Sequence, residues 1–153
     1  LWHYEQFLFT VPVMLILLGS LIVTFLQLAA NKSSISNTEK WLVHIPFSVY
    51  LGWITVATVA NITDLLEYLN WDGFGISPVV WMWIMLAAVL VIASLMNFSR
   101  RDVPYALVIL WSLAGISIKH ASISAVSIPT WVAFGGVALT LILSLTVDKS
   151  RTG

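Results

Sequence analysis

Residues 41–69 read WLVHIPFSVYLGWITVATVANITDLLEYL, a stretch that is long and apolar enough to cross a bilayer as a helix. One face of that helix would carry aromatic, small and polar side chains at three- and four-residue steps. They are Tyr50, Trp53, Ala57, Asn61, Asp64 and Tyr68. Inside lipid such a face costs energy unless it meets protein, water or a ligand. We therefore take this face as the first candidate for a binding site.

The whole chain has the composition of a membrane protein. Of its 153 residues, 59% are hydrophobic and 9% are charged, an apolar excess that a soluble domain of this size could not cover. Crossing a hydrocarbon core takes roughly 20 helical residues, and the expected helices are 7–30, 42–66, 78–97, 103–121 and 129–147. Because backbone groups in lipid must pair internally, the sequence predicts an all-α, polytopic integral membrane helical bundle: one membrane domain with five transmembrane helices.

The basic residues are distributed unevenly between the two sides of such a bundle. Five crossings place the loops 31–40, 98–102 and 148–153 on one side, and that side holds Lys32, Lys40, Arg100, Arg101, Lys149 and Arg151. The other side keeps only Lys119 of the 7 basic residues. Under the positive-inside rule the basic loops and the C-terminus are expected to be cytoplasmic or stromal. This pattern suits a bacterial inner membrane or a thylakoid or plastid membrane.

The segment YLGWITVATVAN at 50–61 resembles the last transmembrane helix of the tryptophan-rich sensory protein family, also called the translocator or peripheral-type benzodiazepine receptor family. That helix begins Tyr-Leu-x-Trp, with alanine four and asparagine eight residues after the tryptophan, as at Trp53, Ala57 and Asn61. The chain departs from the pattern at Val49, where the family has a proline; Pro46 stands a turn earlier.

The resemblance extends over about the first 70 residues. Residues 7–30 are similar to the family's fourth helix, and residues 1–7 to the aromatic end of its third, so an upstream part of the natural protein is expected to precede Leu1. The family's first two helices have no counterpart here. The helices in 78–147 resemble those added in a longer bacterial and plastid-type branch.

The resemblance implies a binding protein, of sensor or transporter type, for tetrapyrroles such as porphyrin or haem, or for other flat hydrophobic molecules such as sterols. Trp53, Ala57 and Asn61 carry over as pocket lining, whereas Tyr50 and Asp64 are candidates from the helical face alone. Indole and phenol rings supply stacking faces, and a carboxamide both donates and accepts hydrogen bonds. In the competing interpretation the same face packs against a neighbouring helix, with Asn61 hydrogen-bonded across the bundle.

Other side chains are weaker candidates. His44 and His120 stand near helix ends, where an imidazole could ligate the metal of a haem or chlorophyll or simply bond to headgroups. Gly136, Thr140 and Ser144 form a stripe of small residues that favours close helix packing or a subunit contact. Trp41, Trp71, Trp81, Trp83 and Trp131 stand at helix ends and are expected to anchor there with their N–H groups wetted.

Several classes of function are disfavoured by what the sequence lacks. The chain has 0 cysteines, which excludes thiolate ligation and disulfides by these residues. It also has no serine–histidine–acid set, phosphate loop, metal-ligand cluster or basic patch outside the membrane rim, so neither an enzyme nor a nucleic-acid-binding protein is expected. The alternative to a ligand-binding protein is a structural accessory subunit of a larger membrane complex, such as a pigment-containing one. The expected partners are the lipid bilayer, a hydrophobic small molecule, and either other membrane proteins or further copies of the chain in a homo-oligomer.

Overall fold

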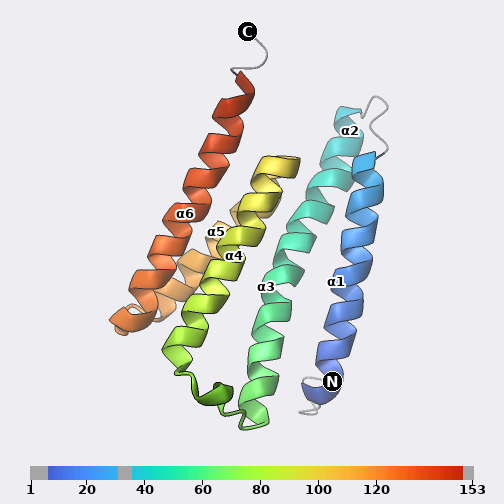
Figure 1. Ribbon diagram of the computed structural model, residues 1–153. Helices are drawn as coiled ribbons and strands as arrows, with labels where there is room; N and C mark the ends of the chain where they lie inside the picture. Colours follow the sequence, from blue (N-terminus) through green and yellow to red (C-terminus); the bar gives the residue numbers. More distant parts are fainter. Residues whose placement is uncertain (1–6, 31–35, 150–153) are drawn as a thin grey trace. The chain divides into compact units, whose positions relative to one another are not determined.

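The computed structural model describes residues 7–30 and 36–149, and over them it consists of helices joined by short turns (Figure 1). Its elements are α1 (Phe7–Ala30), α2 (Asn37–Glu39), a π-helical turn (Lys40–His44), α3 (Ile45–Tyr68), a 3-10 turn (Gly73–Gly75), α4 (Pro78–Arg100), α5 (Val103–Lys119) and α6 (Ser124–Lys149). The chain divides into two compact units, Leu1–Trp71 and Asp72–Gly153. The expected match of residues 1–6 to a preceding helix lies outside the described residues.

The predicted fold class is confirmed. In the described part of the chain, 4 helices are long and apolar enough to span a membrane: Leu8–Leu28, Asn37–Tyr68, Pro78–Arg100 and Ser124–Val147. The fifth apolar helix, α5, has 17 residues, which at about 1.5 Å per residue is at the lower limit for a crossing. Many large apolar side chains stay exposed along these helices, as lipid contact allows.

The second span is longer than the sequence predicts because it begins before the expected residue 42. Asn37 to Tyr68 form one continuous helix that contains the π-helical turn Lys40–His44. Within that turn the Ile45 N–H bonds to the Lys40 carbonyl, one residue further back than in an α-helix. Pro46 follows at once, and a proline has no N–H and crowds the carbonyl four residues before it. The wider turn lets the helix continue through this proline.

The first unit is an antiparallel pair of helices, α1 and α3. Thr10, near the start of α1, bonds to Asn61, near the end of α3, which establishes the antiparallel arrangement. The face that α3 buries is made mostly of small or polar residues: Ser48, Leu51, Gly52, Ile54, Thr58 and Asn61. Small residues suit this contact, because in lipid two helices gain from close van der Waals packing rather than from removing apolar surface from water.

The second unit consists of α4, α5 and α6, with α6 packed against both of the others. The buried residues of α6 recur at three- and four-residue steps: Thr130, Ala133, Val137, Leu141 and Ser144. A Cβ added at Gly136 would lie 2.9 Å from a Leu90 methyl carbon of α4, so that glycine permits the close approach of α4. Gly135, directly before it, has nothing within 4 Å.

These two glycines provide a matched test of the α4–α6 contact. Gly136→Leu should lower the free energy of unfolding by about 1–3 kcal/mol relative to Gly135→Leu, because only the first side chain must push Leu90 aside. Both variants replace a glycine by a leucine inside α6, so the change in helix propensity is the same and cancels in the comparison. Thermal unfolding in detergent, followed by circular dichroism, measures the difference; equal melting temperatures would contradict the packing described here.

Candidate functional site

The predicted binding face of α3 is divided between exposed and buried side chains. Tyr50 and Trp53 are 44% and 48% exposed, whereas Asn61 is only 4% exposed. At about 100° per residue, Trp53 and Asn61 are roughly 80° apart around the helix and about 12 Å apart along it. The face therefore lies at the border of the α1–α3 contact, with its aromatic part outside and its carboxamide inside.

Asn61 is held by a hydrogen bond from the neighbouring helix. The Thr10 hydroxyl donates to Asn61 Oδ1 over 3.1 Å, and Thr10 is 5% exposed. The Asn61 amide nitrogen donates no hydrogen bond to any described residue. In this structure the carboxamide joins two helices, as the competing packing interpretation expects, while its N–H groups are still available to an acceptor.

The remaining residues of the face are a small alanine, an acidic residue and a tyrosine. Ala57 lies between Trp53 and Asn61 and is half-buried, so α3 itself places only a methyl group between the indole and the carboxamide. Asp64 is half-buried one turn beyond Asn61, and Tyr68 is 57% exposed at the helix end. The arrangement offers an aromatic surface at one end, suited to stacking a flat molecule, and polar groups at the other.

The two histidines occupy separate units. His44 is the last residue of the π-helical turn. His120 directly follows α5, and its backbone N–H donates to the Ile116 carbonyl. Both are half-buried. Among residues 7–30 and 36–149, no group of three or more His, Cys, Asp or Glu side chains could hold a metal ion. Each histidine could therefore supply only a single axial ligand to a metal already held in a macrocycle.

The small-residue stripe of α6 faces α4 of the same chain. Besides the contact of Gly136 with Leu90, Asn97 Nδ2 donates to Thr140 Oγ1 over 3.0 Å. Ser144 is 2% exposed, and its hydroxyl bonds to the Leu141 carbonyl. Gly136 and Thr140 are therefore engaged in packing within the chain.

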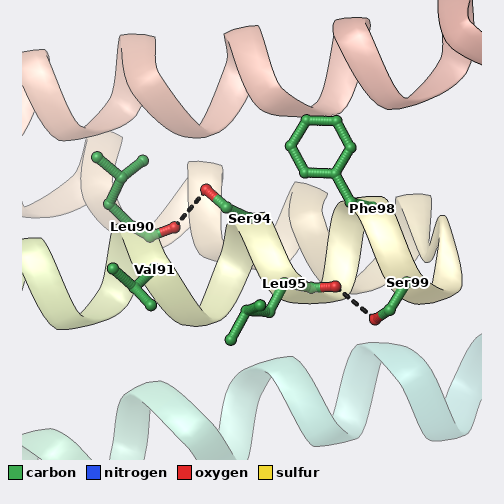
Figure 2. Close-up of a pocket in the computed structure, with 6 residues that line it drawn as sticks. All are labelled: Leu90, Val91, Ser94, Leu95, Phe98 and Ser99. Atoms are coloured by element: carbon green, nitrogen blue, oxygen red, sulfur yellow. Dashed lines mark hydrogen bonds between the residues drawn. The ribbon is translucent and has the colours of Figure 1, made fainter.

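One shallow hollow runs along α4 (Figure 2). It is lined by Leu90, Val91, Ser94, Leu95, Phe98 and Ser99. The two serine hydroxyls bond to carbonyls of their own helix, at Leu90 and Leu95, so the hollow presents almost only hydrocarbon. None of the predicted site residues lines it.

Two polar residues that matter in the structure were not among the sequence candidates. One is Thr10, whose hydroxyl is the hydrogen-bond partner of Asn61. Asn97 was expected to end its helix, but α4 continues to Arg100 and Asn97 is fully buried. An asparagine inside an apolar run was a usable signal, because a carboxamide in lipid requires a partner. Asn97 Oδ1 and Ser117 Oγ are buried without a hydrogen-bond partner in the described part of the chain.

Comparison with known proteins gives one family match. A family model described as "TSPO-like protein" matches residues 1–146, and so includes α4, α5 and the greater part of α6 as well as α1 and α3. No curated protein and no solved structure matches the chain.

The Thr10–Asn61 bond can be tested by removing the hydroxyl without changing the shape of the side chain. Thr10→Val leaves the buried Asn61 oxygen without this donor, so it should lower the free energy of unfolding by about 1 kcal/mol. Thr55→Val is the control, because its hydroxyl bonds only to Leu51 of its own helix, at 2.8 Å. In an Asn61→Leu background the cost of Thr10→Val should disappear; an unchanged cost in this double-mutant cycle would show that the bond does not stabilise the pair.

Proposed function

Because the chain belongs to the TSPO-like protein family, we propose that it is a membrane protein that binds tetrapyrroles or other flat hydrophobic molecules and acts as a sensor or a transporter. The family consists generally of non-enzymatic membrane proteins, so the proposal requires binding and release without chemical conversion. The proposed ligands are porphyrin, haem and chlorophyll.

One observation carries the proposal: Trp53 keeps 48% of its surface exposed in the middle of a membrane-spanning helix. Tyr50 stands one turn before it and is 44% exposed. Residues three apart are neighbours on a helix surface, so the indole and the phenol form one aromatic surface. A macrocycle has the flat apolar face that such rings stack on, and in lipid it reaches them without crossing water.

Asn61 and Asp64 would give this surface its polarity. Asn61 uses its oxygen for Thr10, so the carboxamide would offer its N–H groups to an acceptor on the ligand, such as a carboxylate or a carbonyl. Ala57, between Trp53 and Asn61, leaves space for the edge of a ring system. In this proposal Tyr50, Trp53, Ala57, Asn61 and Asp64 line the site, and His44 or His120 would serve only as an axial ligand to a bound metal.

The proposed location is a bacterial inner membrane or a thylakoid or plastid membrane, with the basic loops on the cytoplasmic or stromal side. Arg100 and Arg101 at the end of α4 and Lys40 before α3 support this orientation, because positively charged loops are retained on that side. Asp64 then lies toward the opposite surface, and the proposed site would open in that direction.

The alternative function is an accessory subunit in a larger complex. One of the sequence features that suggest it is the stripe Gly136, Thr140 and Ser144, and the first two of these residues contact α4 of the same chain. The partner-binding alternative would need a different surface.

Binding can be measured by titrating the protein in lipid nanodiscs with protoporphyrin and following the absorption band of the porphyrin. Trp53→Ala should weaken binding about fivefold, because losing a stacked aromatic ring costs on the order of 1 kcal/mol. Asn61→Ala should also weaken binding, by removing the donors to the ligand. Trp111→Ala is the matched control, since Trp111 is 64% exposed near the middle of α5.

The outcomes separate the proposal from simple partition of the dye into lipid. Nanodiscs without protein supply the baseline, and the control variant should bind like the parent. Equal affinity of the parent, Trp53→Ala and Asn61→Ala would remove the assignment of this face, as would an equal loss in Trp111→Ala. Co-purification of stoichiometric partner proteins without porphyrin binding would favour the accessory-subunit alternative.

A further inference from the structure

The turn before α4 holds a large aromatic residue in a backbone conformation that suits glycine. Gly73, Phe74 and Gly75 have φ values of +64°, +56° and +73° in succession. Glycine adopts this left-handed region freely, but a residue with a Cβ is strained there, and a bulky one is rare. Strain of this kind persists only where surrounding interactions enforce it, and it often marks a position with a function.

Four hydrogen bonds hold the turn in this shape. Asp72 accepts twice: its Oδ1 from the Phe74 N–H at 3.0 Å and its carbonyl from the Gly75 N–H at 3.1 Å. The Gly73 carbonyl accepts from the Ile76 N–H at 3.1 Å and from Trp81 Nε1 at 2.8 Å. Trp81 belongs to the first turns of α4, so the turn is fastened directly to the start of that helix. The expectation that the Trp81 N–H is wetted is therefore wrong.

This rigid turn presents Phe74 outward. The Phe74 side chain is 77% exposed, the largest fraction among the large hydrophobic side chains of the described residues. Ile76, two residues on, is 38% exposed. Gly73 itself is buried under Trp81, whose ring would meet an added Cβ at 3.0 Å. The backbone of the turn is thus packed against Trp81, whereas the Phe74 ring is largely exposed.

We propose that Phe74 is a lipid anchor that inserts into the bilayer at the boundary between headgroups and acyl chains. α4 is long and apolar enough to span the membrane and begins at Pro78, so a turn fastened to its first residues lies at the membrane surface. An exposed phenyl ring is unfavourable in water and favourable in the acyl region, whereas the exposed Asp72 beside it suits the headgroup layer. The occupant of this surface is lipid.

The anchor would set the depth of α4 in the bilayer. Because the Trp81–Gly73 bond links turn and helix, a force on the phenyl ring is transmitted to the start of α4 rather than absorbed by a flexible loop. Phe74 belongs to the second unit, whereas the proposed ligand-binding face belongs to α3 of the first unit. The anchor therefore goes beyond the proposed binding function and does not depend on it.

The insertion can be tested with single-cysteine variants, because the chain has 0 cysteines of its own. Phe74→Cys, carrying a nitroxide spin label, is placed in vesicles of phosphatidylcholine and phosphatidylglycerol. Accessibility is measured by power saturation with oxygen, which concentrates in lipid, and with a water-soluble nickel chelate. The controls are Val132→Cys, at a position 70% exposed within the span of α6, and Ser122→Cys, in the exposed turn before α6.

If Phe74 inserts, the ratio of oxygen access to nickel access at position 74 should be similar to the ratio at position 132. It should be at least severalfold higher than the ratio at position 122. Nickel access equal to that at 122 would place the residue in water and overturn the proposal. Low access to both reagents would indicate contact with protein, either a second copy or another part of the chain, and would also overturn it.

A second variant separates insertion from folding of the turn. Phe74→Gly suits the positive φ and keeps the backbone frame, so its melting temperature should not fall. A spin label at Ile76→Cys should nevertheless gain nickel access when Phe74 is replaced by glycine, because the turn loses its hold on lipid. Unchanged nickel access at position 76 would show that the ring does not hold the turn in the bilayer.

Discussion

The structure depends on one constraint of the lipid interior: a polar group that enters it costs free energy unless it finds a hydrogen-bond partner within the protein. Among the buried polar side-chain atoms of the described residues, only Asn97 Oδ1 and Ser117 Oγ lack one. Most serine and threonine hydroxyls meet this constraint locally, by bonding to a carbonyl one turn earlier in their own helix, as Thr58 does with Ile54 and Thr130 with Val126. A carboxamide is longer and has two ends. Among the described residues, each compact unit contains one buried asparagine that bonds to a threonine of another helix, Asn61 with Thr10 and Asn97 with Thr140.

These two asparagine–threonine pairs favour the observed packing of the helix faces. Each pair joins one end of a carboxamide to a threonine hydroxyl, whereas the Asn61 amide nitrogen and Asn97 Oδ1 make no hydrogen bond to a described residue. Losing the pair would leave the other end of the carboxamide unpaired as well, and that cost favours the observed register. Gly136 also favours one register of α4 and α6, because it permits the close approach of Leu90. The hydrogen bond between Asn97 and Thr140 and the packing at Gly136 thus favour the same helix contact.

The same constraint shapes the proposed site and the proposed anchor. On α3 it draws Asn61 into the helix pair and leaves Trp53 at the border, where one helix face combines a fixed carboxamide with an accessible indole. Near the start of α4, the Trp81 indole N–H donates to the Gly73 carbonyl. This bond holds the turn in the conformation that exposes Phe74. In both places a polar group is satisfied inside the protein, and the neighbouring aromatic ring is presented outside.

The sequence by itself determined the class of fold and most of the helices, because runs of about 20 apolar residues in lipid have few alternatives to a helix. The spacing of Trp53, Ala57 and Asn61 also pointed to the family that the match over residues 1–146 then showed. Helix ends were less determined: α6 begins at Ser124 rather than at 129, since Pro129 is tolerated near the start of a helix that packs well.

Which side of each helix is covered depends on contacts between distant parts of the chain, because in an apolar sequence the faces that meet lipid and the faces that meet protein have similar composition. Thr10 as the partner of Asn61, Asn97 as a buried residue rather than a helix end, and the outward Phe74 all follow from contacts between residues far apart in the chain or from the backbone of a turn. A linear pattern shows that a polar residue needs a partner, and only the folded chain selects one.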